Sequence, residues 1–111
     1  MLPRLLRINT SLFKEIVEKG GFSNGKFFLF RYIKDTGIPR LAVSVPKKVL
    51  KKAVDRNKIR RKVFSSIRKL ISRVQDGYKI IIFTKSGVDK LSQDAILNEI
   101  ESSFVKSGFL K

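Results

Sequence analysis

Hydrophobic residues recur along the chain with two different spacings, one typical of strands and one typical of helices. The segment from 78 to 84 carries the unbroken apolar run Ile80–Phe83, which is typical of a strand covered on both faces. Between 59 and 74, apolar residues recur every three or four positions, which indicates a helix with one buried stripe. That stripe consists of Ile59, Val63, Ile67, Leu70, Ile71 and Val74.

Residues that cap helices or form turns divide the chain into elements. Thr10 or Ser11, Asp55 or Asn57, and Ser92 are candidate helix N-caps. Gly20 ends the first helix, and residues 23–25 indicate a turn. The predicted elements are a helix over 11–19, strands over 26–34 and 40–45, a helix from about 56 to 74, a strand over 78–84 and a helix over 92–106.

The predicted fold class is α+β. The order helix, strand, strand, helix, strand, helix indicates a two-layer sandwich in which helices pack against one small mixed sheet. The chain is expected to form a single domain over residues 1–111, in which residues 1–10 form a loosely ordered basic arm. If the strands on either side of the long helix are parallel, general rules favour a right-handed crossover between them.

Positive charge is concentrated in one stretch. The chain has 111 residues and a formal net charge of +16. The 34 residues from Arg40 to Arg73 hold 13 of its 25 Lys and Arg but only one acid, Asp55. Such a cluster favours a polyanionic partner, most commonly RNA or DNA, over an anionic membrane surface.

The helix that begins near residue 56 is the candidate phosphate-binding element. Arginine presents a planar fork of donors that matches phosphate, and lysine presents a compact charge. No acids are interleaved with this charge run beyond Asp55, so a merely solvated charged face is the weaker interpretation. The candidate residues on or beside this helix are Lys47, Lys48, Asn57, Lys58, Arg60, Arg61 and Arg68.

The strand over 26–34 is rich in aromatic residues. Unpaired nucleic-acid bases stack on aromatic side chains, so an exposed side of this strand would suit a single strand. Packing in the core is the alternative, and it is favoured for any one of these residues taken alone. The candidate platform consists of Phe28, Phe30 and Tyr32, with Phe13 and Ile16 from the first helix.

Several function classes are disfavoured. The chain has no Cys and no His, so thiolate metal sites and histidine acid–base catalysis are excluded. Its nine acids are scattered, which argues against an autonomous metal-dependent nuclease. No secretory signal or apolar run of membrane-spanning length is present, so we expect a cytoplasmic protein with no membrane partner.

Two runs of residues resemble the signature of the bacterial ribonuclease P protein component. They are Val43-Ser44-Val45-Pro46-Lys47-Lys48 and Ala53-Val54-Asp55-Arg56-Asn57-Lys58-Ile59-Arg60-Arg61. The similarity extends to Phe13 with Gly20, to Lys26–Phe30, to Gly77–Ile82 and to Leu91–Phe104, and so covers nearly the whole chain. The resemblance implies a left-handed βαβ crossover of the ribosomal-protein-like kind, against the general rule.

The resemblance also implies roles for particular residues. Arg56, Asn57, Arg60 and Arg61 would face RNA, and Lys58 stands where the family often has arginine. The residues of the candidate platform, Ile16 included, would border a cleft for the 5′ leader of precursor tRNA. The family often has a basic residue where Phe64 stands, and a glycine and a shorter link where Leu50–Lys52 stands.

The function implied is that of a subunit of the ribonuclease P ribonucleoprotein. The RNA of this complex carries out the magnesium-dependent endonucleolytic hydrolysis that removes the leader and makes the mature tRNA 5′ end. The protein, itself non-catalytic, would bind the catalytic RNA and the leader as a monomer, one per RNA, with Mg²⁺ held mainly through the RNA. A basic ribosomal or RNA-chaperone protein with no role in catalysis remains the alternative.

Overall fold

The computed structural model describes residues 7–111, so residues 1–6 of the expected basic arm lie outside the described residues. Arg7 forms an isolated parallel bridge with Leu41. The helices are α1 (Thr10–Lys19), α2 (Ala53–Leu70) and α3 (Gln93–Ser107), with short 3₁₀ turns η2 (Ile71–Arg73) and η3 (Val88–Lys90). The strands are β1 (Gly21–Asn24), β2 (Phe28–Lys34), β3 (Arg40–Ser44) and β4 (Tyr78–Thr84).

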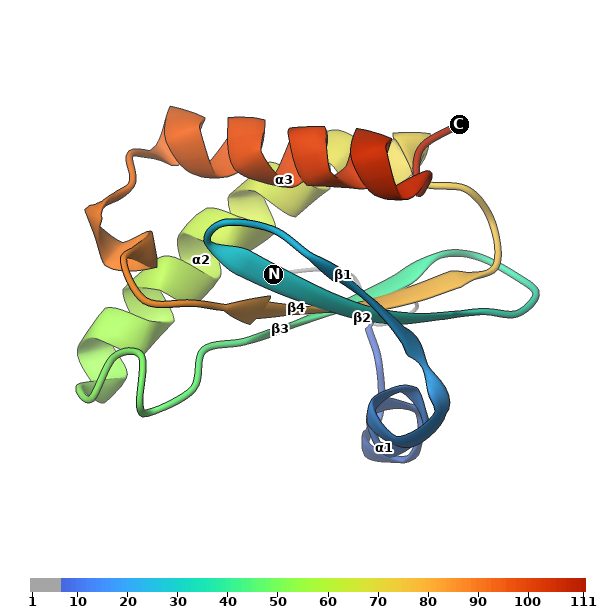
Figure 1. Cartoon of the computed structure of the whole chain (residues 1–111), viewed down its shortest axis with the longest axis horizontal. Coiled ribbons are helices and arrows are strands. Elements are labelled where there is room, and N and C mark those ends of the chain that lie inside the picture. The colour runs from blue at the N-terminus through green and yellow to red at the C-terminus, as the bar shows by residue number, and fades with distance from the viewer. Residues whose placement is uncertain (1–6) are drawn as a thin grey trace.

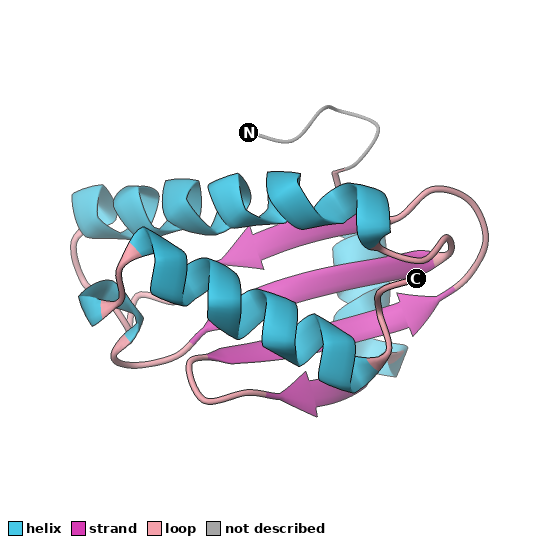
Figure 2. Ribbon diagram, turned by 90° about the horizontal axis from the view of Figure 1, so that it is seen from above, coloured by secondary structure: helices cyan, strands magenta, loops and turns pink. Residues whose placement is uncertain are grey.

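The four strands form one mixed sheet in the order β1-β2-β4-β3. β1 pairs antiparallel with β2 and β2 with β4, while β3 and β4 are parallel. Seen from the helical side in Figure 2, with the strands turned to point upward, β4 lies to the left of β3. The crossover through α2 is therefore left-handed, as the resemblance implies and against the general preference.

The helices cover the two faces of the sheet unequally. Figure 1 shows α2 and α3 on one side of the sheet and α1 alone on the other. Alternation along β4 turns Ile80 and Ile82 toward the α2–α3 layer, where they join the main core. Ile81 points to the other face, where Ile16 of α1 is also completely buried. The predicted two-layer α+β architecture is confirmed, with α1 as an addition on the second face.

The N-cap residues of α1 and α2 differ from those predicted, and the N-cap of α3 agrees with the prediction. Asn9, rather than Thr10 or Ser11, caps α1 by accepting from the Leu12 N–H. The helix α2 begins at Ala53, and its N-cap Lys52 makes no side-chain cap bond, so neither Asp55 nor Asn57 is the cap. Asp55 instead lies in the first turn, where a carboxylate suits the positive end of the helix dipole. Ser92 caps α3 as predicted.

The strand β1 was not predicted. The sequence indicates that the first helix ends at Gly20 and that residues 23–25 form a turn. The four residues of β1 contain a glycine and only one large apolar residue, Phe22. Phe22 is 65% exposed, so no apolar stripe marks this strand. It forms because the N–H of Gly25 donates to the Phe28 carbonyl and folds the chain back along β2.

The loop between β2 and β3 is held by a lysine. Lys79 of β4 is buried, and its Nζ donates to the carbonyls of Thr36 at 2.9 Å and Ile38 at 2.8 Å. Burial lowers the pKa of Lys79 below its ordinary value. The charge of Arg40 lowers this pKa further, whereas Asp35 and Asp76 act in the opposite direction. None of the helices in residues 7–111 is long and apolar enough to cross a membrane.

Two glycines at this end of the sheet give a matched test of the fold. Gly77 (φ +88°) would place a β-carbon 2.2 Å from the Asp35 carbonyl oxygen, whereas Gly37 (φ +87°) has open space around it. We expect Gly37→Ala to lower the free energy of unfolding by about 1–2 kcal/mol, the cost of the left-handed backbone alone. Gly77→Ala adds a backbone clash, so we expect a decrease of about 3 kcal/mol or more. Urea unfolding of both variants measures the difference, and equal decreases would contradict this packing.

Candidate nucleic-acid interface

The outward side of α2 forms a basic face. The buried stripe of Ile59, Val63 and Ile67 fixes the rotation of the helix against the sheet. Asn57, Lys58 and Arg61 are thereby exposed, as are Arg68 and Lys69 further along, while Arg56 and Arg60 are partly buried. We call Asn57, Lys58, Arg60, Arg61 and Arg68 the basic face.

Asn57 lies at the centre of the polar contacts on this face. Its Oδ1 accepts a hydrogen bond from Arg60 Nη1 at 2.5 Å, and its main-chain carbonyl accepts from Arg61 Nε at 3.4 Å. One asparagine thus orients two guanidinium groups one helical turn away. Asn57 therefore holds two groups of donors whose geometry matches a phosphate.

The side chain of Arg56 contacts the loop before α2. Its Nη1 donates to the carbonyls of Leu50 at 3.0 Å and Lys51 at 2.7 Å, in the loop before α2. The side chain therefore turns back and closes this loop. It replaces the missing N-cap as the contact that joins the loop to the helix.

Within residues 7–111, no acid forms an ion pair with the cationic residues at the start of α2, from Arg56 to Lys62. An ion pair does join Arg73 to Glu101 at 2.6 Å, between the end of α2 and α3. Lys47 and Lys48 lie in an exposed turn between β3 and α2, so they extend the positive surface beyond the helix.

The expected aromatic platform is corrected in part. Phe28 and Phe30 are completely buried on the helical side, where the Phe30 ring lies 5.6 Å from Phe104 of α3. Tyr32 shares this face, and its ring centroid lies 4.9 Å from that of Phe109. These three residues therefore do not border an open cleft. Both sides of β2 are apolar, so alternation alone does not show which side is covered.

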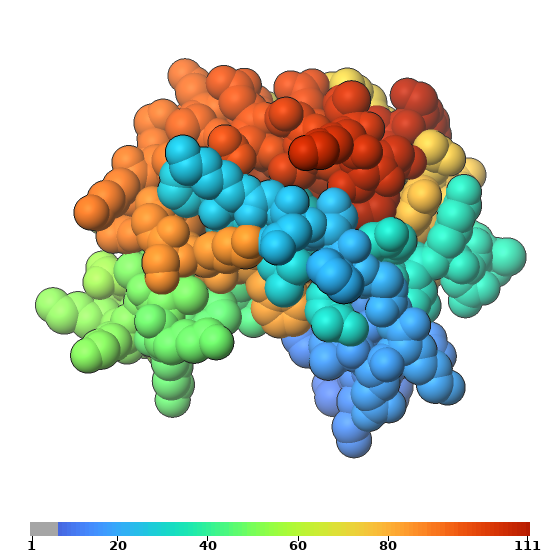
Figure 3. All heavy atoms as spheres, viewed as in Figure 1, coloured from blue at the N-terminus to red at the C-terminus, as the bar shows by residue number. Residues whose placement is uncertain are grey.

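An open cleft does lie on the other face of the sheet, and apart from Lys48 the residues that line it were not predicted from the sequence. Phe83 of β4 and Leu29 of β2 line a cavity of about 340 Å³ that Pro46, Lys48, Val49 and Lys85 also border. The Phe13 ring of α1 packs edge-to-face on Phe83 with centroids 6.1 Å apart. The hollow is visible in Figure 3 between α1 and the segment that leads into α2. We call this hollow the α1 cleft.

Phe13 and Ile16 have different positions at the α1 cleft. Phe13 is partly exposed and contacts the Phe83 ring, so it is placed to line the opening. Ile16 is completely buried under α1 and anchors the helix to the sheet. The available signal for Phe83 was its alternation with Ile82 in β4, which places the two side chains on opposite faces.

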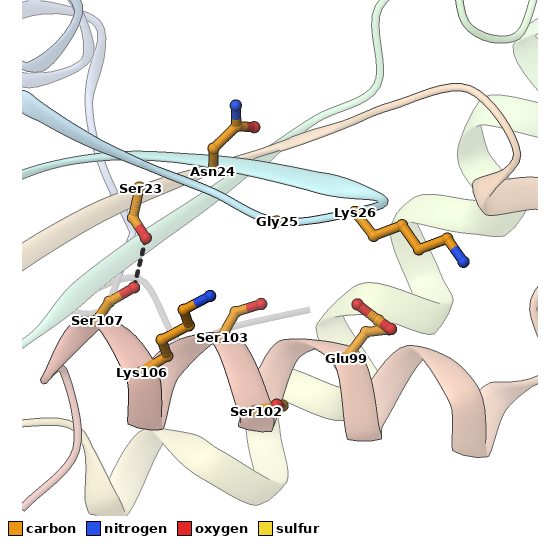
Figure 4. Close-up of a pocket in the computed structure, with 9 residues that line it drawn as sticks. All are labelled: Ser23, Asn24, Gly25, Lys26, Glu99, Ser102, Ser103, Lys106 and Ser107. Atoms are coloured by element: carbon orange, nitrogen blue, oxygen red, sulfur yellow. Dashed lines mark hydrogen bonds between the residues drawn. The ribbon is translucent and has the colours of Figure 1, made fainter.

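A second cavity lies between the β1–β2 hairpin and α3. Its volume is about 170 Å³, and Figure 4 shows Ser103 and Lys106 projecting from α3 toward the hairpin. The hydroxyls of Ser23 and Ser107 are hydrogen-bonded to each other at 2.5 Å across it. Serines and charged residues line this cavity and no aromatic ring does, so bases have nothing to stack on there.

Metal-ligating groups are not gathered in the described residues. Nowhere in residues 7–111 do three or more Asp, Glu, His or Cys side chains come together in a way that could hold a metal ion. Asp89 lies in η3 and Asp94 in the first turn of α3, and neither lines the α1 cleft. The chemistry that this cleft and the basic face offer is therefore the binding of phosphates and of apolar or aromatic groups.

Comparisons with known proteins agree with this geometry. The family model for Ribonuclease P matches residues 2–108. A ribonuclease P protein component from Nitrosococcus oceani is 30% identical over 92% of this chain and 87% of its own. One from Clostridium kluyveri is 31% identical over 89% of this chain and 90% of its own. The structure of the Staphylococcus aureus RNase P protein covers 96% of this chain and 98% of its own, with a TM-score of 0.79 and 24% identity.

The structural likeness supports the fold, and the sequence matches carry the family assignment. Membership implies a place in a ribonucleoprotein that has an RNA partner and processes tRNA. A basic face beside an open apolar cleft is the arrangement such a partner needs. The chain belongs to the ribonuclease P protein family.

Proposed function

We propose that the chain is the non-catalytic protein subunit of the ribonuclease P holoenzyme. The basic face of α2 binds the catalytic RNA, and the α1 cleft holds the 5′ leader of precursor tRNA. By holding the leader, the protein assists the magnesium-dependent endonucleolytic cut that makes the mature tRNA 5′ end. One monomer serves one RNA in this proposal.

The observation that carries the leader role is the composition of the α1 cleft. Phe83 presents an aromatic ring in it, the Phe13 ring packs edge-to-face on Phe83, and Lys48 and Lys85 lie at its border. An unpaired strand exposes its bases for stacking and its phosphates for contact with lysine, whereas a duplex hides its bases. The cleft therefore favours a single strand, which the leader is and the body of a mature tRNA is not.

The basic face supports the second contact. Arg60 and Arg61 are exposed or partly exposed, are oriented by Asn57, and form no ion pair in the described part of the chain. Guanidinium groups arranged along one side of a helix match the phosphates of a folded RNA. The chain runs from the border of the cleft at Pro46, Lys48 and Val49 into α2, which begins at Ala53, so one RNA complex can contact both.

Catalysis is assigned to the RNA partner. Residues 7–111 gather no cluster of metal ligands, and the sequence contains no histidine or cysteine. These residues offer no magnesium site built from three or more protein ligands, so we place Mg²⁺ mainly on the RNA and derive no protein step through it. A basic ribosomal or chaperone protein would share the basic face, but it would not bind precursor tRNA more tightly than mature tRNA because of the leader.

Removal of the Phe13 ring tests the leader role. We expect Phe13→Ala to weaken binding of precursor tRNA about fivefold or more, because one base–aromatic stack carries on the order of 1–3 kcal/mol. Binding of mature tRNA to the same protein–RNA complex should hardly change. Fluorescence titration of both tRNAs measures the ratio, and Phe22→Ala, which removes an exposed ring from β1, is the matched control. An equal decrease in affinity for the two tRNAs would move Phe13 to a purely structural role.

Salt dependence tests the basic face. We expect Arg61→Ala to reduce the slope of log K against log salt by about 0.7–0.9 for each RNA phosphate that the side chain no longer neutralises. Arg61→Lys should keep most of the slope because it keeps the charge, and Lys106→Ala on α3 should leave the slope unchanged. An unchanged slope in Arg61→Ala would exclude a phosphate contact at this position.

A further inference from the structure

A third cavity, of about 240 Å³, lies at the edge of the sheet between β3 and α2. Leu41, Ala42 and Val43 of β3 form one side. Arg60 and Phe64, one helical turn apart on α2, form the other, and Arg7 with Ile8 closes one end. We call this cavity the edge pocket. It is separate from the α1 cleft, whose floor is Phe83 on the far face of the sheet.

The lining of the edge pocket combines a flat apolar surface with positive charge. Phe64 is partly buried and offers part of its ring, and the Val43 side chain, which lies on the helical face of β3, is apolar. Two guanidinium-bearing residues, Arg7 and Arg60, also line it, and no acid does. An apolar peptide would bury these cations without a partner, and a second copy of this strongly basic chain would be repelled by them. A nucleobase that carries its own phosphate would meet it favourably.

The main chain of β3 adds hydrogen-bonding groups beside this pocket. β3 is an edge strand, and within residues 7–111 its open side is bridged only at Leu41, by Arg7. Figure 2 shows this edge strand lying beside α2. Consecutive residues of a strand point their N–H and C=O groups to alternate sides, so either Val43 or Ser44 presents a donor and an acceptor outward. Such a pair matches the edge of a base.

We propose that the edge pocket binds one unpaired nucleobase of the RNA that lies on the basic face, stacked on Phe64. This proposal rests on the proposed function, since Arg60 belongs both to that face and to this pocket. The phosphate next to the base meets Arg60, which Asn57 holds in place. The basic face then supplies affinity, and the edge pocket selects a site where the RNA has an unpaired base.

Nuclear magnetic resonance with small probes tests the pocket on the full chain. Adenosine 5′-monophosphate should shift the methyl signals of Val43 and the ring signals of Phe64 in a saturable way. Ribose 5-phosphate, which has the same charged group and no base, should bind there at least about fivefold more weakly. Equal shifts with both probes, or shifts confined to Phe13 and Phe83, would overturn the proposal.

Two variants separate stacking from packing. Phe64→Leu keeps an apolar side chain against the core but removes the ring, so we expect affinity for adenosine 5′-monophosphate to fall about fivefold or more while the fold is retained. Phe22→Ala should leave that affinity unchanged. Unchanged affinity in Phe64→Leu would contradict the proposal. Leader-dependent binding of precursor tRNA tests the proposed function separately. If that binding is seen but adenosine 5′-monophosphate and ribose 5-phosphate give equal shifts, the edge-pocket proposal is wrong and the proposed function stands.

Discussion

Burial of β4 on both of its faces is the constraint on which the other parts depend. Ile80, Ile81 and Ile82 are all completely buried, and β4 pairs with β2 on one side and β3 on the other. Its helical face holds α2 and α3, and its opposite face holds α1 and the floor of the α1 cleft. The basic face, the α1 cleft and the edge pocket are therefore placed relative to one strand, which has no exposed edge. Rigid placement of this kind favours binding two parts of one RNA complex at once.

The charge on α2 opposes its folding, and the apolar stripe offsets that cost. Like charges three or four residues apart destabilise a helix, and Lys58, Arg61 and Lys62 are spaced in this way. Ile59, Val63 and Ile67 are almost completely buried beneath them and hold the helix to the sheet. A polyanion on the outward side would relieve the repulsion, so binding of RNA should stabilise the fold as well as the complex.

Sequence patterns predict where helices and strands lie better than they predict which face of each element is buried. The stripe of α2 is recognisable because its apolar residues recur every three or four positions. The strand β4 is recognisable because its apolar run is unbroken, as expected for a strand that is covered on both faces. The strand β1 has no such pattern, because pairing with β2 makes it extended. For Phe28 and Phe30 the pattern suggests an open side only because both sides of β2 are apolar. The tertiary contacts of α3, through Phe104, decide which side is covered.

The candidate site shows the same division. Arg60, Arg61 and Asn57 are predictable from their spacing on a helix whose buried side is known. The turn of Arg56 toward the Leu50 and Lys51 carbonyls depends on the conformation of a loop that has no periodic pattern. The role of Phe83 depends on where α1 docks, and α1 lies far from β4 along the chain. Contacts between distant segments are what local patterns do not contain.

Cleavage of precursor tRNA at low magnesium tests the central claim most directly. The protein alone, a bacterial ribonuclease P RNA alone and the two together should be compared under the same conditions. We predict cleavage at the mature 5′ end only in the mixture, because the protein supplies binding and the RNA supplies the chemistry. Cleavage by the protein alone, or no gain in the mixture over the RNA alone, would contradict the account.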